Sequence, residues 1–102
     1  MDGGKLTVMA LIRAKSEKEE IVKQGLLALL EPTRKEAGCI NYDLHQSVGT
    51  PGLFMFYENW KSNKDLDEHL KMPYMKDFMR KGREILAGPP EVTLWEMIEP
   101  PD

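Results

Sequence analysis

The stretch LFMFYENWKSNKDLDEHL, residues 53–70, decides the fold of this chain. Its first eight residues are aromatic or apolar at nearly every position, which is typical of a strand that is covered on both faces. Because successive strand side chains point to opposite faces, every second residue belongs to the same face. The two faces therefore carry, respectively, Phe54, Phe56, Glu58 and Trp60, and Leu53, Met55, Tyr57 and Asn59.

A helix is expected directly after this strand. A polar run ends the strand, and Ser62 followed by Asp65 is a pattern that begins helices, because these side chains can bond free backbone N–H groups. Residues three and four apart share a helix face, so Leu66, His69 and Leu70 point the same way. A glutamate, a tryptophan, two phenylalanines and an inward-facing histidine thus fall within one short stretch, which makes it the candidate functional site.

The flanking sequence predicts three more strands and two more helices. Apolar patterning indicates strands over 5–15, 39–48 and 91–99, and helices over 16–36 and 73–87. Ser16 and Glu19 form a capping-box pattern at the start of the first helix. Pro32 predicts a kink in that helix, and Gly38 is expected to end it. Residues 49–52, GTPG, predict the turn of a hairpin.

The resulting order of elements, β-α-β-β-α(α)-β, is the split βαβ arrangement of ferredoxin-like folds. We therefore expect an α+β fold with an antiparallel four-stranded sheet, formed by one domain over 5–99, with flexible termini at 1–4 and 100–102. Helices cover one face of such a sheet, yet the first, third and last strands are apolar on both faces. A second copy of the same sheet is the simplest cover for the other face, so a homodimer is expected.

The composition is ordinary for a soluble globular protein, and it argues against nucleic acid and membranes as partners. The 102 residues include 30% charged side chains and carry a net charge of −3, so no basic surplus is present to attract nucleic acid. No apolar run is long enough to span a bilayer, and the first residues lack the pattern of a signal peptide. With Cys39 as the one cysteine, no internal disulfide can form. A cytoplasmic protein without membrane or nucleic-acid partners is expected.

No cofactor motif is found in the sequence. The two histidines and the cysteine lack the spacing of a metal site, and acidic residues cluster only where helix surfaces are expected to face solvent. The chain has no glycine-rich phosphate loop, nucleophile elbow or dinucleotide fingerprint. Neither a metal nor an organic cofactor is therefore expected.

Several short motifs from about Lys5 to Glu99 match, in combination, those of one known family. They are Lys15-Ser16, Pro32-Thr33-Arg34, Glu36-Ala37-Gly38-Cys39, Tyr42-Asp43-Leu44-His45-Gln46, Phe56-Tyr57-Glu58-Asn59-Trp60, Leu66–Leu70 with its His69, and Pro73 before the last helix. Together they resemble the antibiotic biosynthesis monooxygenase (ABM) domain family. The resemblance implies a small dimeric α/β barrel, and it implies kinship with cofactor-free oxygenases of quinols and anthrones.

At two places the chain differs from the motifs of family members, and these differences limit the activities that the resemblance implies. Many close relatives have a histidine directly after the equivalent of Pro73, where this chain has Tyr74. Haem-degrading relatives use an asparagine in the first strand and a histidine in the last helix, and this chain has neither residue in those elements. Haem degradation is therefore disfavoured.

Chemistry and resemblance together lead us to expect an enzyme, a cofactor-independent monooxygenase that oxidises small electron-rich aromatic compounds of quinol or anthrone type with O2. His69 would be the catalytic base, because histidine suits proton transfer near neutral pH. The indole N–H of Trp60 or a tyrosine hydroxyl would hold the oxyanion of the substrate. The expected substrate-binding residues are Trp60, Phe56, Glu58, Tyr57, Tyr74, Phe78 and Met79.

Structural roles stay open for several of these residues. A buried carboxylate needs a partner, so Glu58 is expected to pair with Arg13 or Arg34 unless it serves a site. His69 could equally be a hydrogen-bonded core residue.

At the level of function, the alternatives are a non-catalytic dimeric module that binds a small ligand and a small-metabolite isomerase of the same family. RNA binding, suggested by the βαββαβ order and the strand aromatics, conflicts with the acidic composition.

Overall fold

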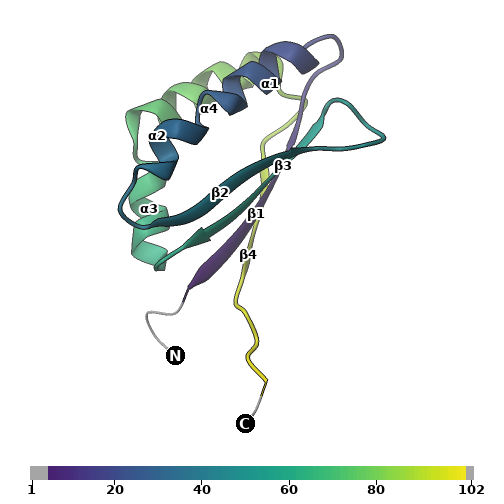
Figure 1. Cartoon of the computed structure of the whole chain (residues 1–102). Helices are drawn as coiled ribbons and strands as arrows, with labels where there is room; N and C mark the ends of the chain where they lie inside the picture. Colours follow the sequence, from purple (N-terminus) through teal and green to yellow (C-terminus); the bar gives the residue numbers. More distant parts are fainter. Residues whose placement is uncertain (1–4, 101–102) are drawn as a thin grey trace.

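The computed structural model describes residues 5–100 and confirms an α+β, ferredoxin-like fold with a four-stranded antiparallel sheet. Its elements are β1 (Leu6–Arg13), α1 (Glu19–Leu27), α2 (Leu30–Arg34), β2 (Cys39–Gln46), β3 (Leu53–Trp60), α3 (Asn63–Leu70), α4 (Pro73–Ile85) and β4 (Glu91–Trp95). The helices lie on one side of the sheet and leave its other face open (Figure 1). The termini predicted to be flexible, apart from Pro100, lie outside the described residues.

The strands pair in the order β2-β3-β1-β4, and every pair is antiparallel. β2 forms one edge, as its half-polar pattern predicts, and β4 forms the other. The last strand ends at Trp95, earlier than the predicted Glu99. Trp95 is opposite Thr7, and β1 begins only one residue before Thr7, so the residues after Trp95 have almost no strand to pair with.

The first helix is divided where the sequence predicts a kink. α1 ends at Leu27 and α2 begins at Leu30, and Ala28 at the junction lies four positions before Pro32. Proline has no N–H to give to the carbonyl of Ala28, and its ring crowds that carbonyl. The chain therefore ends one helix and begins another.

The start of α1 differs from the expected capping box. The helix begins at Glu19 with Lys18 at the N-cap, and no side chain caps it. The carboxylate of Glu19 instead accepts the backbone N–H of Glu17 at 3.3 Å, and Glu17 has a left-handed φ of 70°. Ser16 consequently lies two residues before the N-cap and cannot close the predicted box.

Gly38 has a different role from the expected helix stop. α2 ends at Arg34, several residues earlier. A methyl group on Gly38 would lie 2.2 Å from Cγ of Asp65 in α3, a distance at which the atoms overlap. Glycine is therefore needed here because the first turn of α3 packs directly against the backbone that leads into β2.

The core lies between the helices and the inward face of the sheet. The inward side chains of β3 are all buried, as the two-residue period predicts. The outer face carries apolar side chains that stay at least partly exposed, namely Met9, Leu11, Leu53, Met55, Tyr57 and Trp95. Within one chain β3 is thus covered on one face only, and cover for the second face would have to come from another molecule.

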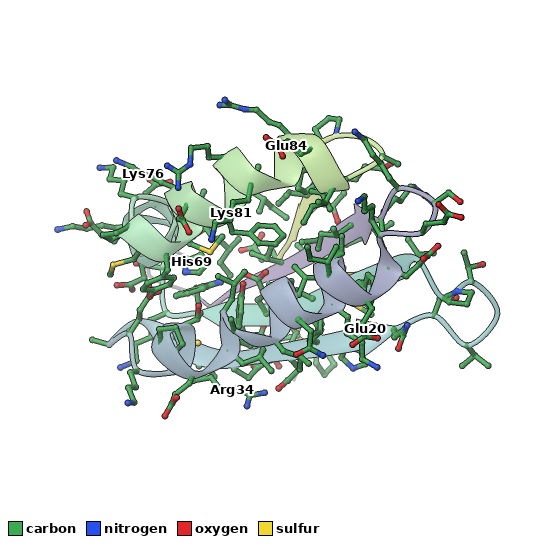
Figure 2. The ribbon with its side chains drawn as sticks, turned by 90° about the horizontal axis from the view of Figure 1, so that it is seen from above. Glu20, Arg34, His69, Lys76, Lys81 and Glu84 are labelled. Atoms are coloured by element: carbon green, nitrogen blue, oxygen red, sulfur yellow. The ribbon has the colours of Figure 1, made fainter. Side chains whose placement is uncertain are left out.

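The outer surface of the helical layer is charged. Figure 2 shows Lys76, Lys81 and Glu84 on α4 and Glu20 on α1, all of them exposed, whereas His69 lies deeper among the helices. No helix within residues 5–100 combines the length and the apolar character that crossing a membrane requires. The charged surface of the helices thus faces away from the sheet, whereas His69 faces the space between the helices and the sheet.

Candidate active site

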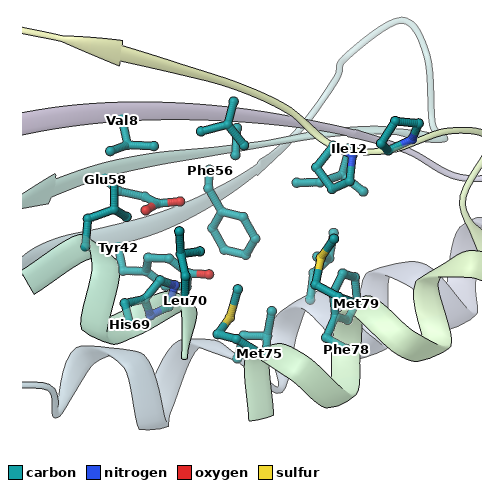
Figure 3. Close-up of a pocket in the computed structure, with 17 residues that line it drawn as sticks. Val8, Ile12, Tyr42, Phe56, Glu58, His69, Leu70, Met75, Phe78 and Met79 are labelled. Carbon is teal, nitrogen blue, oxygen red and sulfur yellow. The ribbon is translucent and has the colours of Figure 1, made fainter. Parts of the chain in front are cut away.

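A cavity of about 450 Å³ lies between the helices and the inward face of the sheet. Of the 17 residues that line it, three carry polar side-chain groups: Tyr42 from β2, Glu58 from β3 and His69 from α3. Figure 3 shows these three together at one end of the cavity, with Phe78 and Met79 at the other end. This size, and an apolar lining with a few convergent polar groups, are typical of a site for a small ligand.

Local sequence explains how His69 reaches this cavity. Ser62 is the N-cap of α3, and its hydroxyl oxygen accepts the backbone N–H of Asp65 at 3.2 Å, which confirms the predicted helix start. One turn later, His69 shares the buried face of the helix with Leu66. Only 1% of the His69 side chain is exposed, so the imidazole belongs to the cavity wall.

The ring of His69 is held by Glu36, which follows α2. Nδ1 of His69 lies 2.9 Å from Oε2 of Glu36, and the same oxygen accepts the hydroxyl proton of Tyr74. Because an ionised carboxylate can only accept, His69 donates through Nδ1 and the neutral ring keeps a lone pair on Nε2. Among residues 5–100 Nε2 has no hydrogen-bond partner, so it is available as a base.

Glu58 is a buried carboxylate without a cationic partner among the described residues. Its side chain is 5% exposed, and Oε1 accepts the indole N–H of Trp60 at 2.9 Å. The predicted pairing with Arg13 or Arg34 is wrong, because both arginines pair with other carboxylates at the surface. The inward position of Glu58 on β3, beneath the helices, keeps it away from both guanidinium groups.

Burial raises the pKa of Glu58 from 4.5 to about 7. The hydrogen bond from Trp60 acts in the opposite direction, and the negative charge of Glu36 adds to the rise. A carboxyl group that exchanges its proton near neutral pH inside a cavity has the properties of a functional acid or base.

Tyr42 is the third polar group of the cavity. Its ring stacks on Phe56 with the centroids 4.4 Å apart and meets the His69 ring edge-on at 5.4 Å. Burial, and then the charge of Glu58, raises the pKa of the Tyr42 phenol, so the hydroxyl keeps its proton. Tyr42, which sequence analysis did not place in the site, faces Glu58 directly across the β2–β3 ladder.

Five of the predicted site residues line the cavity together: Phe56, Glu58, His69, Phe78 and Met79. The structure does not bring the other three to its surface. Trp60 lies behind His69, with ring centroids 4.6 Å apart, and gives its N–H to Glu58. Tyr74 bonds Glu36, and Tyr57 lies on the outer face of the sheet with 40% of its surface exposed.

Glu36 is a second site residue, besides Tyr42, that sequence analysis missed. Its side chain is 8% exposed, although it follows a charged and exposed helix end. The signal for it is weak, because it lies 33 residues before its partner His69 and the contact depends on how α2 docks near α3. A buried histidine nevertheless requires a partner for its N–H, and that requirement could have prompted a search for a carboxylate.

The arrangement places an imidazole, a carboxyl group and a phenol at one end of an apolar cavity. A small ligand with an apolar body and a polar group at that end fits this distribution of groups. Within residues 5–100, no three histidine, cysteine, aspartate or glutamate side chains are grouped so as to hold a metal ion. An imidazole, a carboxyl group and a phenol can each transfer a proton.

Known proteins are similar to this chain in both sequence and fold. A family model described as "Antibiotic biosynthesis monooxygenase" matches residues 5–81. "Putative monooxygenase YcnE" of Bacillus subtilis is 31% identical over 94 residues, which cover 92% of this chain and 99% of that protein. An uncharacterized protein of Synechocystis is also 31% identical over 94 residues, but this chain spans only 64% of its length.

Two solved structures are similar over nearly the whole chain. A protein of Pseudomonas aeruginosa superimposes with a TM-score of 0.91 at 29% identity, covering 97% of this chain and 99% of that one. A protein of Mycobacterium tuberculosis superimposes with a TM-score of 0.88 at 27% identity, covering 97% of this chain and all of that one. The arrangement of sheet and helices is therefore common to all three chains.

Proposed function

Because the chain belongs to the antibiotic biosynthesis monooxygenase family, we propose that it is a cofactor-independent monooxygenase of small aromatic compounds of quinol or anthrone type, with O2 as the second substrate. The observation that carries the proposal is the contact between Nδ1 of His69 and Glu36. It supports a base function for Nε2 in the wall of an apolar cavity.

The proposed reaction depends on shape and proton transfer. The substrate ring lies against Phe56, Phe78 and Met79, with its oxygen toward the polar end of the cavity. Nε2 of His69 removes a proton from the substrate, and the carboxylate of Glu36 stabilises the imidazolium that forms. The resulting aromatic anion is rich enough in electrons to reduce O2 itself, so the proposal includes no flavin, haem or metal.

Tyr42 is the proposed hydrogen-bond donor to the oxyanion of the substrate. The indole N–H of Trp60, the other expected donor, is already bonded to Glu58. The hydroxyl of Tyr42 keeps its proton and lies beside His69, where the substrate oxygen would become charged. A donor fixed in this way stabilises the charge that develops in the transition state.

Oxygen consumption with a panel of quinols and anthrones tests the proposed function. We expect at least one compound to be oxidised with equimolar uptake of O2, by colourless protein and with no effect of a chelator. Binding of the same compounds without oxygen uptake, unchanged in His69→Ala, would instead identify a non-catalytic ligand-binding module. Conversion of a compound without oxygen uptake would identify an isomerase.

We also propose that the protein is a homodimer that buries the open face of the sheet. On that face Met9 and Leu11 of β1 lie opposite Tyr57 and Met55 of β3, and Trp95 of β4 adds a further exposed apolar side chain. A monomer seldom leaves so large an apolar surface in contact with water. A second copy of the same sheet would match it in shape and character.

A further inference from the structure

We propose that Glu58 exchanges a proton in the neutral pH range and acts as the second proton-transferring group of the cavity, opposite in role to His69. The inference rests on the proposed function, because it assigns a further catalytic residue to the same reaction. It goes beyond substrate binding, since Glu58 would give a proton to an oxygen of the reacting complex and later take one back.

The geometry leaves one oxygen of Glu58 available to a ligand. Oε1 accepts the N–H of Trp60 at 2.9 Å, which fixes the orientation of the carboxyl group. No hydrogen bond from residues 5–100 reaches the other oxygen, Oε2, and Glu58 is one of the residues that line the cavity. A protonated carboxyl can therefore keep its bond with Trp60 while its O–H points to a ligand.

The surroundings of Glu58 favour the neutral form. The groups that face it are Val8 from β1, Tyr42 and Cys39 from β2, His69 from α3 and the carboxylate of Glu36. No lysine or arginine is among the lining residues of the cavity, and Glu58 forms no ion pair within the described chain. Burial raises the pKa of this carboxyl to about 7, in agreement with the geometry.

The two carboxyl groups near His69 thus have different environments and different roles. Glu36 receives two hydrogen bonds, one from Nδ1 of His69 and one from the hydroxyl of Tyr74. Glu58 receives a single bond from Trp60 in an apolar cavity. Where environment separates two carboxyl groups in this manner, one serves as an ion and the other as an acid.

A neutral Glu58 is also what the proposed intermediate needs. The reaction passes through an aromatic anion, and a second negative charge in the same cavity would oppose its formation. The O–H of Glu58 would instead donate to that anion. The negative charge in the cavity stays low when His69 takes the proton of the substrate and Glu58 keeps its own proton while the anion forms.

For an anthrone-type substrate the overall reaction converts a ring methylene group and one O2 molecule into a ring carbonyl group and one water molecule. His69 takes the first proton, and the substrate anion reduces O2 and forms the C–O bond of a peroxide, which Glu58 protonates. The Glu58 carboxylate then removes the second proton from carbon while the O–O bond breaks. The hydroxide that leaves takes the proton from His69, so both residues return to their first state.

Infrared spectroscopy tests the protonation directly and needs no turnover. At about pH 6, wild type should show the carbonyl band of a protonated carboxyl that Glu58→Gln lacks, and the band should disappear from wild type by about pH 8. Glutamine retains the size of the side chain and an oxygen for the N–H of Trp60. If wild type and Glu58→Gln give the same carboxyl spectrum at about pH 6, the inference is wrong.

Binding of 2,4-dinitrophenolate, which stays anionic from about pH 6 to about pH 9, tests the role of the proton without any substrate. The His69→Gln background removes the imidazole as a second group that could donate a proton to the anion. In that background the affinity should fall by up to about tenfold per pH unit above about pH 7, and adding Glu58→Gln should remove the fall. An affinity that is independent of pH in His69→Gln would overturn the inference, and this result does not depend on whether the protein is an oxygenase.

If a substrate is oxidised, kinetics provide the third measurement. Loss of the acid form of Glu58 should cause the rate in wild type to decline above about pH 7, and Glu58→Gln should be slower by about 10²-fold or more, without this decline. A Glu58→Gln enzyme with the rate and the alkaline decline of wild type would exclude proton transfer by Glu58.

Discussion

The imidazole of His69 and the carboxylate of Glu36 are 2.9 Å apart, although 33 positions of the chain separate them. The contact joins the buried face of α3 to the segment after α2, and the side chains of both residues are buried. Since Glu36 accepts the proton of Nδ1, it determines which nitrogen of His69 can accept a proton from a ligand. The orientation and the tautomer of the imidazole are thus set by one interaction.

His69→Gln is expected to keep the fold and aromatic binding but to slow oxidation by roughly 10²–10⁴-fold, the usual contribution of a general base. Steady-state rates and circular dichroism measure the two effects. A lower melting temperature with unchanged turnover per folded molecule would show that His69 is a core residue.

Glu36→Gln is expected to lower kcat by about 10- to 100-fold with little change in KM, because Glu36 orients His69 and does not touch the substrate. Tyr74→Phe is the matched control, since it removes the other hydrogen bond to Glu36 and leaves the bond from His69. Its kcat should change much less. Equal losses of kcat in the two variants would contradict a positioning role for Glu36. A higher KM with an unchanged kcat in Glu36→Gln would contradict it as well.

Glu58→Gln is expected to stabilise the protein above about pH 7 and to have little such effect below about pH 4.5. Burial raises the native pKa of Glu58 above its unfolded value of 4.5, so the native state holds a proton that the unfolded state has released. The stabilisation from this group is complete below the unfolded pKa and is lost as pH rises through about 7. A shift of this size corresponds to about 3 kcal/mol.

Urea unfolding of wild type and Glu58→Gln at several pH values measures this difference. Glu84→Gln on the exposed surface of α4 is the control, and its stability should follow wild type at every pH. A constant difference between wild type and Glu58→Gln from about pH 4 to about pH 9 would show that Glu58 titrates at an ordinary pH.

Gly38→Ala is expected to lower the free energy of unfolding by about 1–3 kcal/mol, the usual cost of forcing extra volume into a packed region. The added methyl group would overlap Asp65, whose backbone N–H bonds the capping Ser62. Gly49→Ala is the control, because nothing lies within 4 Å of the corresponding position in the hairpin turn. Thermal unfolding should separate the two, and equal melting temperatures would contradict the close packing of α3.

Sedimentation at micromolar concentration is expected to give twice the chain mass of 11.7 kDa. Met55→Lys, which places a charge on the open face of the sheet, should shift the protein toward monomer. Ile21→Lys, at an exposed apolar position on α1, should leave the dimer intact. A monomeric wild type would contradict the dimer and leave the apolar outer face without an explanation.

The parts of the structure that depend on short-range rules could be predicted from the sequence. The period of β3 placed Phe56 and Glu58 on the buried face, and the pair Ser62 and Asp65 marked the start of α3. These features follow from the geometry of one strand or one helical turn. The βαββαβ order and the edge position of β2 followed from them.

The parts that depend on packing between distant elements could not be predicted. Glu36 meets His69 only because α2 and α3 end near each other, and Tyr42 enters the cavity only because the β2–β3 register places it opposite Glu58. The expected arginine partners of Glu58 were wrong for the same reason. The sequence indicates that the negative charge of a buried carboxylate must be neutralised. It does not indicate whether a positively charged side chain or a bound proton neutralises it.

The cavity takes its polar groups from β2, β3 and α3, whereas α4 contributes only apolar side chains, Met75, Phe78 and Met79. Evolution can therefore alter the size of the ligand at three positions of one helix without disturbing Glu58 or His69. Methionine makes such change easy, because its unbranched side chain adapts to neighbours of different shape. Chains that keep the same arrangement of Glu58 and His69 can thus differ in the size of their ligands through α4 alone.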